Sequence, residues 1–454
     1  MTPSLASRTR SRALAALAAL VVLGSLARFA AAAPPPHRAL PDYDGRPPAP
    51  ASTLDGVRSA ARAVLFPLRV AVDYVVRRPL GVVIRWAEHS RFVRARFKSR
   101  FRGTPSRTMS IFPIAFYDFG FQTSVGFRML WSNGFATPGS KFSLKVTTAG
   151  QHWGRGDGSI LVAVPGPFHG VRVGVDGTVN WRPDQQFFGL GPRSSQSGRA
   201  RFLDARFGVS ANLGWKTLAL VLGTLSTYTG PSGYEPGFSM EEQVAAGNLP
   251  GPPAGYGDLA VTKRVGLRFA LDSRDEDEHV NSGARLDGLV ERVADDDVGR
   301  WTHLNATLGG ALVLDRVGEH LLNVRVRLEM IDAPTGLQVP FLELSSIGGN
   351  RDLRGFGGGR GRDVSAAALA LNYQWPLGAW LDATLYLATG NVFGRRLSGL
   401  TAGNLRGSAG VGVSLAGLSD ERQVELAVAF GTDPFAEGGK ISSYRLSLGY
   451  SYGY

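Results

Sequence analysis

The sequence contains no cysteine among its 454 residues. Disulfide frameworks, thiolate zinc sites, thiol redox chemistry and cysteine nucleophiles are therefore excluded. Mean hydropathy is -0.03, so the chain also lacks the repeated long apolar runs that a bundle of transmembrane helices requires. Glycine, in contrast, is abundant at 59 residues, close to twice the usual share of about 7%.

Residue combinations typical of catalysis are absent. The seven histidines are scattered, and the G-x-S-x-G run at 449–453 lies within a run of period two, not at a strand-to-helix elbow, whereas a hydrolase needs a nucleophile, a histidine and a carboxylate that converge. The acidic run 272–278, followed by His279, lacks the glycine and the terminal glutamate of a calcium loop and is more typical of a solvated turn. We therefore expect neither an enzyme nor a resident cofactor, metal ion or small-molecule substrate.

Acidic residues are outnumbered, with 37 Asp and Glu against 50 Lys and Arg and a net charge of +13. Such an excess first suggests a nucleic-acid partner. The excess is confined to residues 1–33, which carry +4, and 52–102, which carry +9, while 34–51 and 103–454 are each neutral. A glycine-arginine run at 354–362 resembles RNA-binding segments, but it is single and a strand follows it. We therefore expect no nucleic-acid partner.

The first of the basic segments has the order of a secretory signal peptide. Arg8, Arg10 and Arg12 precede the apolar run 13–27, and four alanines follow at 30–33. The apolar run is too short for a membrane anchor, which needs about 20 residues. We assign 1–32 to a cleaved signal peptide and 33–51 to an extended Pro-rich linker.

Residues 52–103 have helical periodicity broken at Pro67 and Pro79. Arginines lie along one face, with Val, Trp and Phe along the other. The arginines in the middle make a span across a bilayer costly, so we expect periplasmic amphipathic helices that lie on an anionic membrane surface or pack at the end of another domain. An ordinary surface helix of a soluble domain is the alternative.

Beyond residue 105 the periodicity becomes two. The clearest case is 443–454, where Tyr and Leu alternate with Ser, Arg and Gly. Runs of 10 to 13 residues of this kind repeat along some 350 residues, a length that suits tilted membrane-spanning strands of about 9 to 11 residues. Sixteen runs are predicted, at 109–117, 120–132, 139–149, 157–165, 168–181, 200–213, 216–226, 258–271, 283–294, 300–314, 319–331, 364–376, 379–390, 404–416, 421–431 and 442–453.

An even number of strands and the pattern of loop lengths both favour an all-β transmembrane barrel, at 104–454. The longest connections, 182–199, 227–257, 332–363 and 391–403, follow odd-numbered strands, and tight turns follow even-numbered ones. Bacterial outer-membrane barrels have long external loops and short periplasmic turns. A large soluble β protein such as a propeller is the alternative, but it explains neither the strand lengths nor the alternation of loops.

Two motifs connect this pattern to a known family. The element at 347–356 contains Gly348, Gly349, Arg354, Gly355 and Phe356, and the turn from Asp272 through Arg274 and Asp275 to Gly283 is a D-x-R-D...G sequence. These resemble the sixth external loop and a periplasmic turn of the BamA/TamA-type barrels of the bacterial surface antigen superfamily. Weaker matches lie at 187–191, 391–393 and 406–412.

The resemblance implies that Arg354 folds back into the lumen and meets acidic residues on the twelfth and thirteenth strands. Asn372 and Ala388 occupy the positions of those acids here. Because a buried arginine without an anion is costly, we expect Asp382, which has the same strand parity as Ala388, to be the partner.

The resemblance also implies a function at the outer membrane. Family members that assemble proteins carry POTRA modules before the barrel, whereas 52–102 has no strand pattern and is too short for one. The chain therefore resembles a POTRA-less branch, with its N-terminal segment in the periplasm. We expect a barrel that helps to insert or export proteins or lipids, with outer-membrane lipid and unfolded outer-membrane proteins as partners, or alternatively a passive pore.

The seam between the first and last strands is the expected place of action. Pro113 removes a ladder N–H from the first strand, and Gly449 weakens packing in the last, so this closure is expected to open sideways. Tyr450, Tyr452 and Tyr454 form the aromatic ladder at the end of the chain.

Overall fold

A computed structural model places much of the chain beyond residue 108. It describes residues 109–118, 124–133, 139–150, 153–164, 171–194, 198–213, 218–231, 237–273, 283–315, 320–350, 352–377, 381–415 and 422–452. The predicted signal peptide, linker and basic helices lie outside the described residues and stay predictions. Over the described ranges, no helix is both long enough and apolar enough to cross a bilayer.

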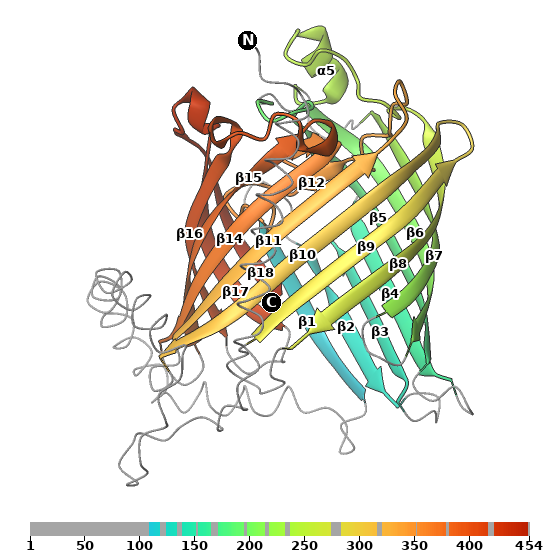
Figure 1. The fold of residues 1–454 in the computed structure, drawn as a ribbon, viewed down its shortest axis with the longest axis vertical. Coiled ribbons are helices and arrows are strands. Elements are labelled where there is room, and N and C mark those ends of the chain that lie inside the picture. The colour runs from blue at the N-terminus through green and yellow to red at the C-terminus, as the bar shows by residue number, and fades with distance from the viewer. Residues whose placement is uncertain are drawn as a thin grey trace, which may run out of the picture.

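Sixteen long strands form one antiparallel sheet that curls into a barrel of tilted strands (Figure 1). They are β1 (Met109–Asp118), β2 (Ser124–Ser132), β3 (Lys141–Thr148), β4 (Gly154–Ala163), β5 (Arg172–Phe187), β6 (Gly198–Leu213), β7 (Leu218–Pro231), β8 (Leu259–Asp272), β9 (Gly283–Asp295), β10 (Gly299–Asp315), β11 (His320–Asp332), β14 (Ser365–Pro376), β15 (Leu381–Phe393), β16 (Arg406–Leu415), β17 (Arg422–Thr432) and β18 (Ile441–Tyr452). The prediction of an all-β barrel of about sixteen strands is confirmed, and each strand overlaps its expected place, with ends that differ by six residues at most.

Each strand pairs with its neighbours in sequence, and β18 returns to contact β1. The exception lies between β11 and β14, which pair directly. The chain between them forms a separate hairpin of β12 (Ser345–Ile347) and β13 (Gly361–Asp363). The intervening loop therefore belongs to no barrel strand, and it is the segment that carries the 347–356 motif.

Side chains alternate between two environments, as the period of two requires. On β18, Tyr444 is 63% exposed and Leu448 39%, while Arg445 and Ser447 are buried. Outward positions of other strands also carry exposed large apolar side chains, among them Phe127, Val175, Phe207, Leu222, Val265, Leu267, Val411 and Phe430. A continuous apolar exterior of this size is rare in soluble proteins and suits the hydrocarbon core of a bilayer.

The long connections gather at one end of the barrel. The helix α5 (Met240–Ala245) lies there (Figure 1), and a capping box between Ser239 and Glu242 starts it. Two backbone N–H groups, of Gly237 and Ser239, hydrogen-bond the Glu242 carboxylate and lower its pKa. The largest apolar cluster of buried side chains joins these loops to the strand ends and includes Met240, Trp301 and Phe341. The loops are therefore a packed cap on the strands.

A charge on the outer face should be costly, whereas one on the lumen face should be tolerated. Leu222 faces outward on β7 and is 47% exposed, and its neighbour Val221 points to the lumen. We expect Leu222→Arg to lower the free energy of unfolding by about 2 to 4 kcal/mol in lipid vesicles, and Val221→Arg to lower it far less. Urea titration followed by heat-modifiable electrophoresis measures both. Equal costs for the two variants would contradict a lipid-facing exterior.

Candidate functional site

The loop between β12 and β13 turns back into the barrel through two glycines. Gly348 and Gly349 have φ values of 112° and 80°, which L side chains rarely adopt. The Gly349 N–H donates to the carbonyl of Phe356 at 2.9 Å and holds the two arms of the loop together. We call residues 348–360 the lumen loop. The predicted roles of Gly348 and Gly349, to let the backbone turn, agree with this geometry.

Gly355 brings the lumen loop into direct contact with the backbone of β17. A Cβ atom at this position would lie 2.1 Å from the carbonyl carbon of Phe430, which no side chain could tolerate. Two neighbouring strands hold the same residue, because its N–H donates to the Ser408 hydroxyl of β16 at 2.8 Å and the Ser443 hydroxyl of β18 donates to its carbonyl. Phe356 then packs over Gly431, where a Cβ would meet its ring at 2.4 Å.

The wall beneath the lumen loop is built from small side chains. Lumen-facing positions of β14 to β17 carry mainly Ala, Gly and Ser, namely Ala366, Ala368, Ala370, Ala388, Gly390, Ser408, Gly410, Gly412, Ala427, Ala429 and Gly431. Ile347, Leu353 and Phe356 pack against this surface, and Leu353 is fully buried. The small side chains of this wall therefore leave space inside the barrel, and the lumen loop fills that space.

Arg354 forms an ion pair with Glu425 of β17. Its Nη1 lies 2.8 Å from Oε2 of the glutamate, and its guanidinium carbon lies 3.7 Å from the centre of the Tyr386 ring. Gly412 makes room between the two partners, since a Cβ there would be 2.5 Å from Glu425 Oε1. Burial strengthens both the ion pair and the cation–π contact relative to water.

The prediction that Asp382 is the partner of Arg354 is wrong. Asp382 on β15 accepts a hydrogen bond from the amide of Gln374 at 3.1 Å. The register aligns Asp382 with Ser414 and Ser414 with Glu425, so the two acids share a row but stand two strands apart. Because Gly355 docks on β16 to β18, the arginine beside it reaches the acid on β17.

Sequence reasoning missed Glu425, although its strand carried a signal. Leu426, Val428 and Phe430 form the outward face of β17, and Ala427, Ala429 and Gly431 accompany Glu425 on the inward face. A single acid among small residues on a lumen face indicates that something else in the lumen neutralises it.

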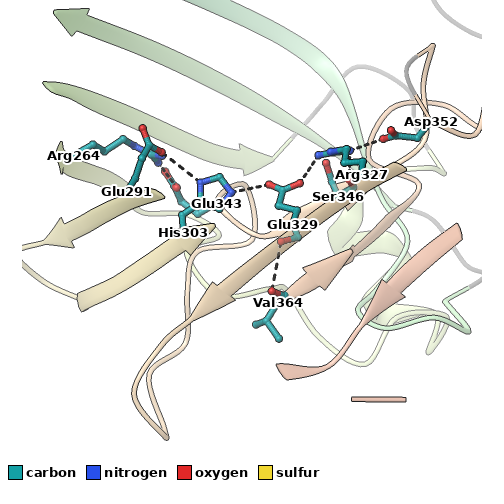
Figure 2. Close-up of polar contacts among 10 residues, drawn as sticks. Arg264, Glu291, His303, Arg327, Glu329, Glu343, Ser346, Asp352 and Val364 are labelled. Atoms are coloured by element: carbon teal, nitrogen blue, oxygen red, sulfur yellow. Dashed lines mark hydrogen bonds and ion pairs between the residues drawn. The ribbon is translucent and has the colours of Figure 1, made fainter. Parts of the chain in front are cut away.

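A second set of contacts joins the lumen loop to the opposite wall (Figure 2). Arg327 of β11 contacts Asp352 of the loop and Glu329 of its own strand. On β18, Arg445 donates to the side-chain oxygen of Asn350 at 2.6 Å. The loop is therefore bonded to β11 on one side and to β16, β17 and β18 on the other.

The Arg327 contacts continue as a row of charges across four strands. His303 of β10 lies between Glu329 and Glu291 of β9, with ring nitrogens 2.9 Å and 3.4 Å from their carboxylate oxygens. Arg264 of β8 then joins Glu291, at 3.5 Å, to Glu343 in the connection after β11. We call this row the lumen charge row, and its order is Glu343, Arg264, Glu291, His303, Glu329, Arg327 and Asp352.

Buried arginines also tie the loops together above the lumen. Arg360 stacks on Phe188, 4.4 Å from the ring centre, and donates to the Ser194 hydroxyl at 3.3 Å. Arg406 donates to the carbonyls of Pro192 and Ser194. Burial lowers the pKa of Arg360 to about 9, and the neighbouring Arg406 contributes to this shift. Arg360 and Arg406 thus join the connection at 188–194 to the end of the lumen loop and to β16.

The other predicted site residues are only partly described. Asp272 forms an ion pair with Arg285 at 3.3 Å, and Gly283 starts β9 with a φ of 127°. Arg274 and Asp275 lie outside the described residues, as does Tyr454. Within the ranges that the structure describes, no group of three or more His, Asp or Glu side chains is arranged to hold a metal ion.

The seam residues lie on the first and last strands as expected. Pro113 pairs in register with Phe127 of β2, and Gly449, Tyr450 and Tyr452 pair with Glu425, Val424 and Arg422 of β17. Between β1 and β18 the described ladder has two pairs, Tyr117 with Leu448 and Asp118 with Ser447.

Comparison with known proteins supports the fold. No protein-family model matches the sequence, and neither does any curated protein. BamA from Haemophilus ducreyi, in a crystal structure lacking POTRA domains 1-3, has a TM-score of 0.52 and 14% identity over 76% of this chain and 70% of that chain. CdiB from Acinetobacter baumannii has a TM-score of 0.47 and 12% identity over 77% and 60%. The chain has the fold of a BamA-type barrel, as the motifs predicted.

Breaking the ion pair between Arg354 and Glu425 should lower the free energy of unfolding of the barrel. Removing either member of a buried pair costs about 3 to 5 kcal/mol. We expect Arg354→Met and Glu425→Gln each to fall in this range in urea titrations, and the double variant to cost little more than either alone. Asp382→Asn is the matched control, and its effect should add to that of Arg354→Met. Stronger coupling of Arg354 to Asp382 than to Glu425 would contradict the assignment.

A methyl group at Gly355 should release the lumen loop. The added Cβ of Gly355→Ala would overlap the backbone of β17, whereas a Cβ at Gly358 of the same loop would meet nothing within 4 Å. We expect trypsin to cleave the loop of folded Gly355→Ala rapidly and to leave Gly358→Ala protected. Equal protection of the two variants would show that the docking does not depend on this contact.

Proposed function

We propose that this chain is an outer-membrane barrel of the BamA type that assists the insertion or translocation of proteins or lipids. Its partners are outer-membrane lipid and unfolded outer-membrane proteins, and the proposal assigns it no catalytic role. The fold and the apolar exterior support the location, and the seam supports the activity.

The observation that carries the proposal is the short described ladder between β1 and β18. Among described residues this ladder has two pairs, whereas β1 pairs with β2 over eight residues and β17 with β18 over eleven. Backbone N–H and C=O groups that a ladder leaves unpaired are a template for another strand. A client segment can add to such an edge through main-chain hydrogen bonds, which require no particular client sequence.

The lumen loop supports the same proposal because it binds the strands beside the seam. Gly355 is bonded to Ser408 of β16 and Ser443 of β18, and Asn350 is bonded to Arg445 of β18. Movement of β18 away from β1 would therefore act on the docked loop. The loop couples events at the seam to the lumen.

A passive pore is the competing function, and loss of the protein distinguishes the two. Depletion followed by quantification of the outer-membrane proteome should lower the amounts of other barrels if this chain assembles them. A pore has no reason to change them. In planar bilayers, a large steady conductance that does not depend on Arg354 would favour the pore.

Locking the seam should abolish the proposed activity. The chain has no cysteine, so the double variant Tyr117→Cys with Leu448→Cys would place a single disulfide at a described seam pair. We expect oxidation to block insertion of an unfolded barrel protein into vesicles, and a reductant to restore it. The matched control is Leu426→Cys with Leu448→Cys, which uses the same β18 position on the β17 ladder. Full insertion with the seam locked would refute lateral opening.

A further inference from the structure

The lumen charge row is symmetric about His303. On each side the order is a wall glutamate, an arginine and then a carboxylate from the connection between β11 and β14 (Figure 2). Arg264 thus holds both Glu291 of the wall and Glu343 of the loop. Arg327 likewise holds both Glu329 of the wall and Asp352 of the lumen loop. Each arginine is shared between a strand and a loop.

The position of His303 indicates that its ring carries two protons. Its Nε2 faces a carboxylate oxygen of Glu329 at 2.9 Å, and its Nδ1 faces one of Glu291 at 3.4 Å. A neutral imidazole has one N–H and one lone pair, so one of its nitrogens would point a lone pair at an anion. Both contacts are favourable when the ring is an imidazolium.

The protonated ring also brings the row closer to electrical neutrality. Four carboxylates face two arginines and the imidazolium, which leaves one negative charge in excess. Other charged groups nearby are Asp204 and Arg206 of β6 and Arg362 of β13. Loss of the His303 proton leaves four carboxylates to share two arginines. The wall glutamates then attract the arginines more strongly, at the expense of the loop carboxylates.

We propose that His303 is a proton-dependent latch that holds the 333–344 connection and the lumen loop against the barrel wall. With the proton bound, the imidazolium neutralises the wall glutamates, and the arginines hold Glu343 and Asp352. When the proton leaves as the pH rises, both loop anchors weaken together. The latch thus holds both segments against the wall at low pH and releases them at high pH. This does not depend on whether the barrel assembles proteins or conducts solutes.

The absence of cysteine allows a direct test in the full-length chain. Ala368 lies on β14 beneath the lumen loop, where it is 8% exposed. We expect a membrane-impermeant thiol reagent to label Ala368→Cys slowly in mildly acidic buffer and about tenfold faster in alkaline buffer, because docking is linked to proton binding. Labelling of Gly358→Cys, at an exposed position of the same loop, normalises for the intrinsic rise of thiol reactivity with pH.

Variants of His303 test whether its charge controls the labelling of position 368. In the Ala368→Cys background, His303→Lys retains a cation and should keep position 368 protected at every pH. His303→Gln is neutral and should allow fast labelling at every pH. His320→Gln is the matched control, since His320 is also buried but contacts Tyr373 away from the row, and it should retain the pH response. An unchanged pH response in His303→Gln would overturn the proposal.

A spectroscopic measurement avoids any dependence on how the variants fold. Nitrogen NMR of the unmodified protein labelled at histidine reports whether each ring nitrogen is protonated. We expect both nitrogens of His303 to carry protons at neutral pH, and the loss of one to coincide with the rise in labelling at position 368. A neutral His303 ring at neutral pH would refute the latch.

Discussion

Alternation of side chains along a strand is the constraint on which the other features of this protein depend. Because successive residues point to opposite faces, each strand that carries Leu222 or Phe430 to the apolar exterior must carry its next residue into the lumen. Polar and charged groups therefore collect inside the barrel, where water is limited and each charge needs a partner. The ion pairs of the lumen follow from the apolar exterior.

The same alternation made most of the fold predictable. The alternation predicted sixteen strands, and the loop lengths predicted which end of the barrel carries the long connections. Both signals are local in sequence. The lumen loop was recognised from its glycines and from Arg354. Its backbone contact with β17 requires a glycine at position 355. The sequence around that glycine does not indicate which strand the loop contacts. The partner of Arg354 depends on which strand the loop contacts. For this reason the sequence predicted Asp382, whereas the structure has Glu425.

The lumen charge row escaped sequence reasoning for a related reason. His303, Glu291 and Glu329 lie on three strands and become neighbours only through the register of β9, β10 and β11. A shift of one residue in either pairing would turn one member to the outer face of the barrel. Each of these residues alone reads as an ordinary lumen polar group, so neither composition nor periodicity distinguishes them. The signal lies in pairing, which a single sequence does not contain.

The lumen has two unlike halves, and the lumen loop joins them. On β8 to β11 the wall carries the paired charges of the row, while on β14 to β17 it carries small residues that admit the loop. Asp352 binds the first half through Arg327. Two and three positions further along the chain, Arg354 and Gly355 bind the second half, through Glu425 and Ser408. Leu353 is fully buried between these anchors and packs with Ile347 and Phe356. Because only one or two residues separate these anchors, we expect a change in the contacts of Asp352 to alter those of Arg354 and Gly355.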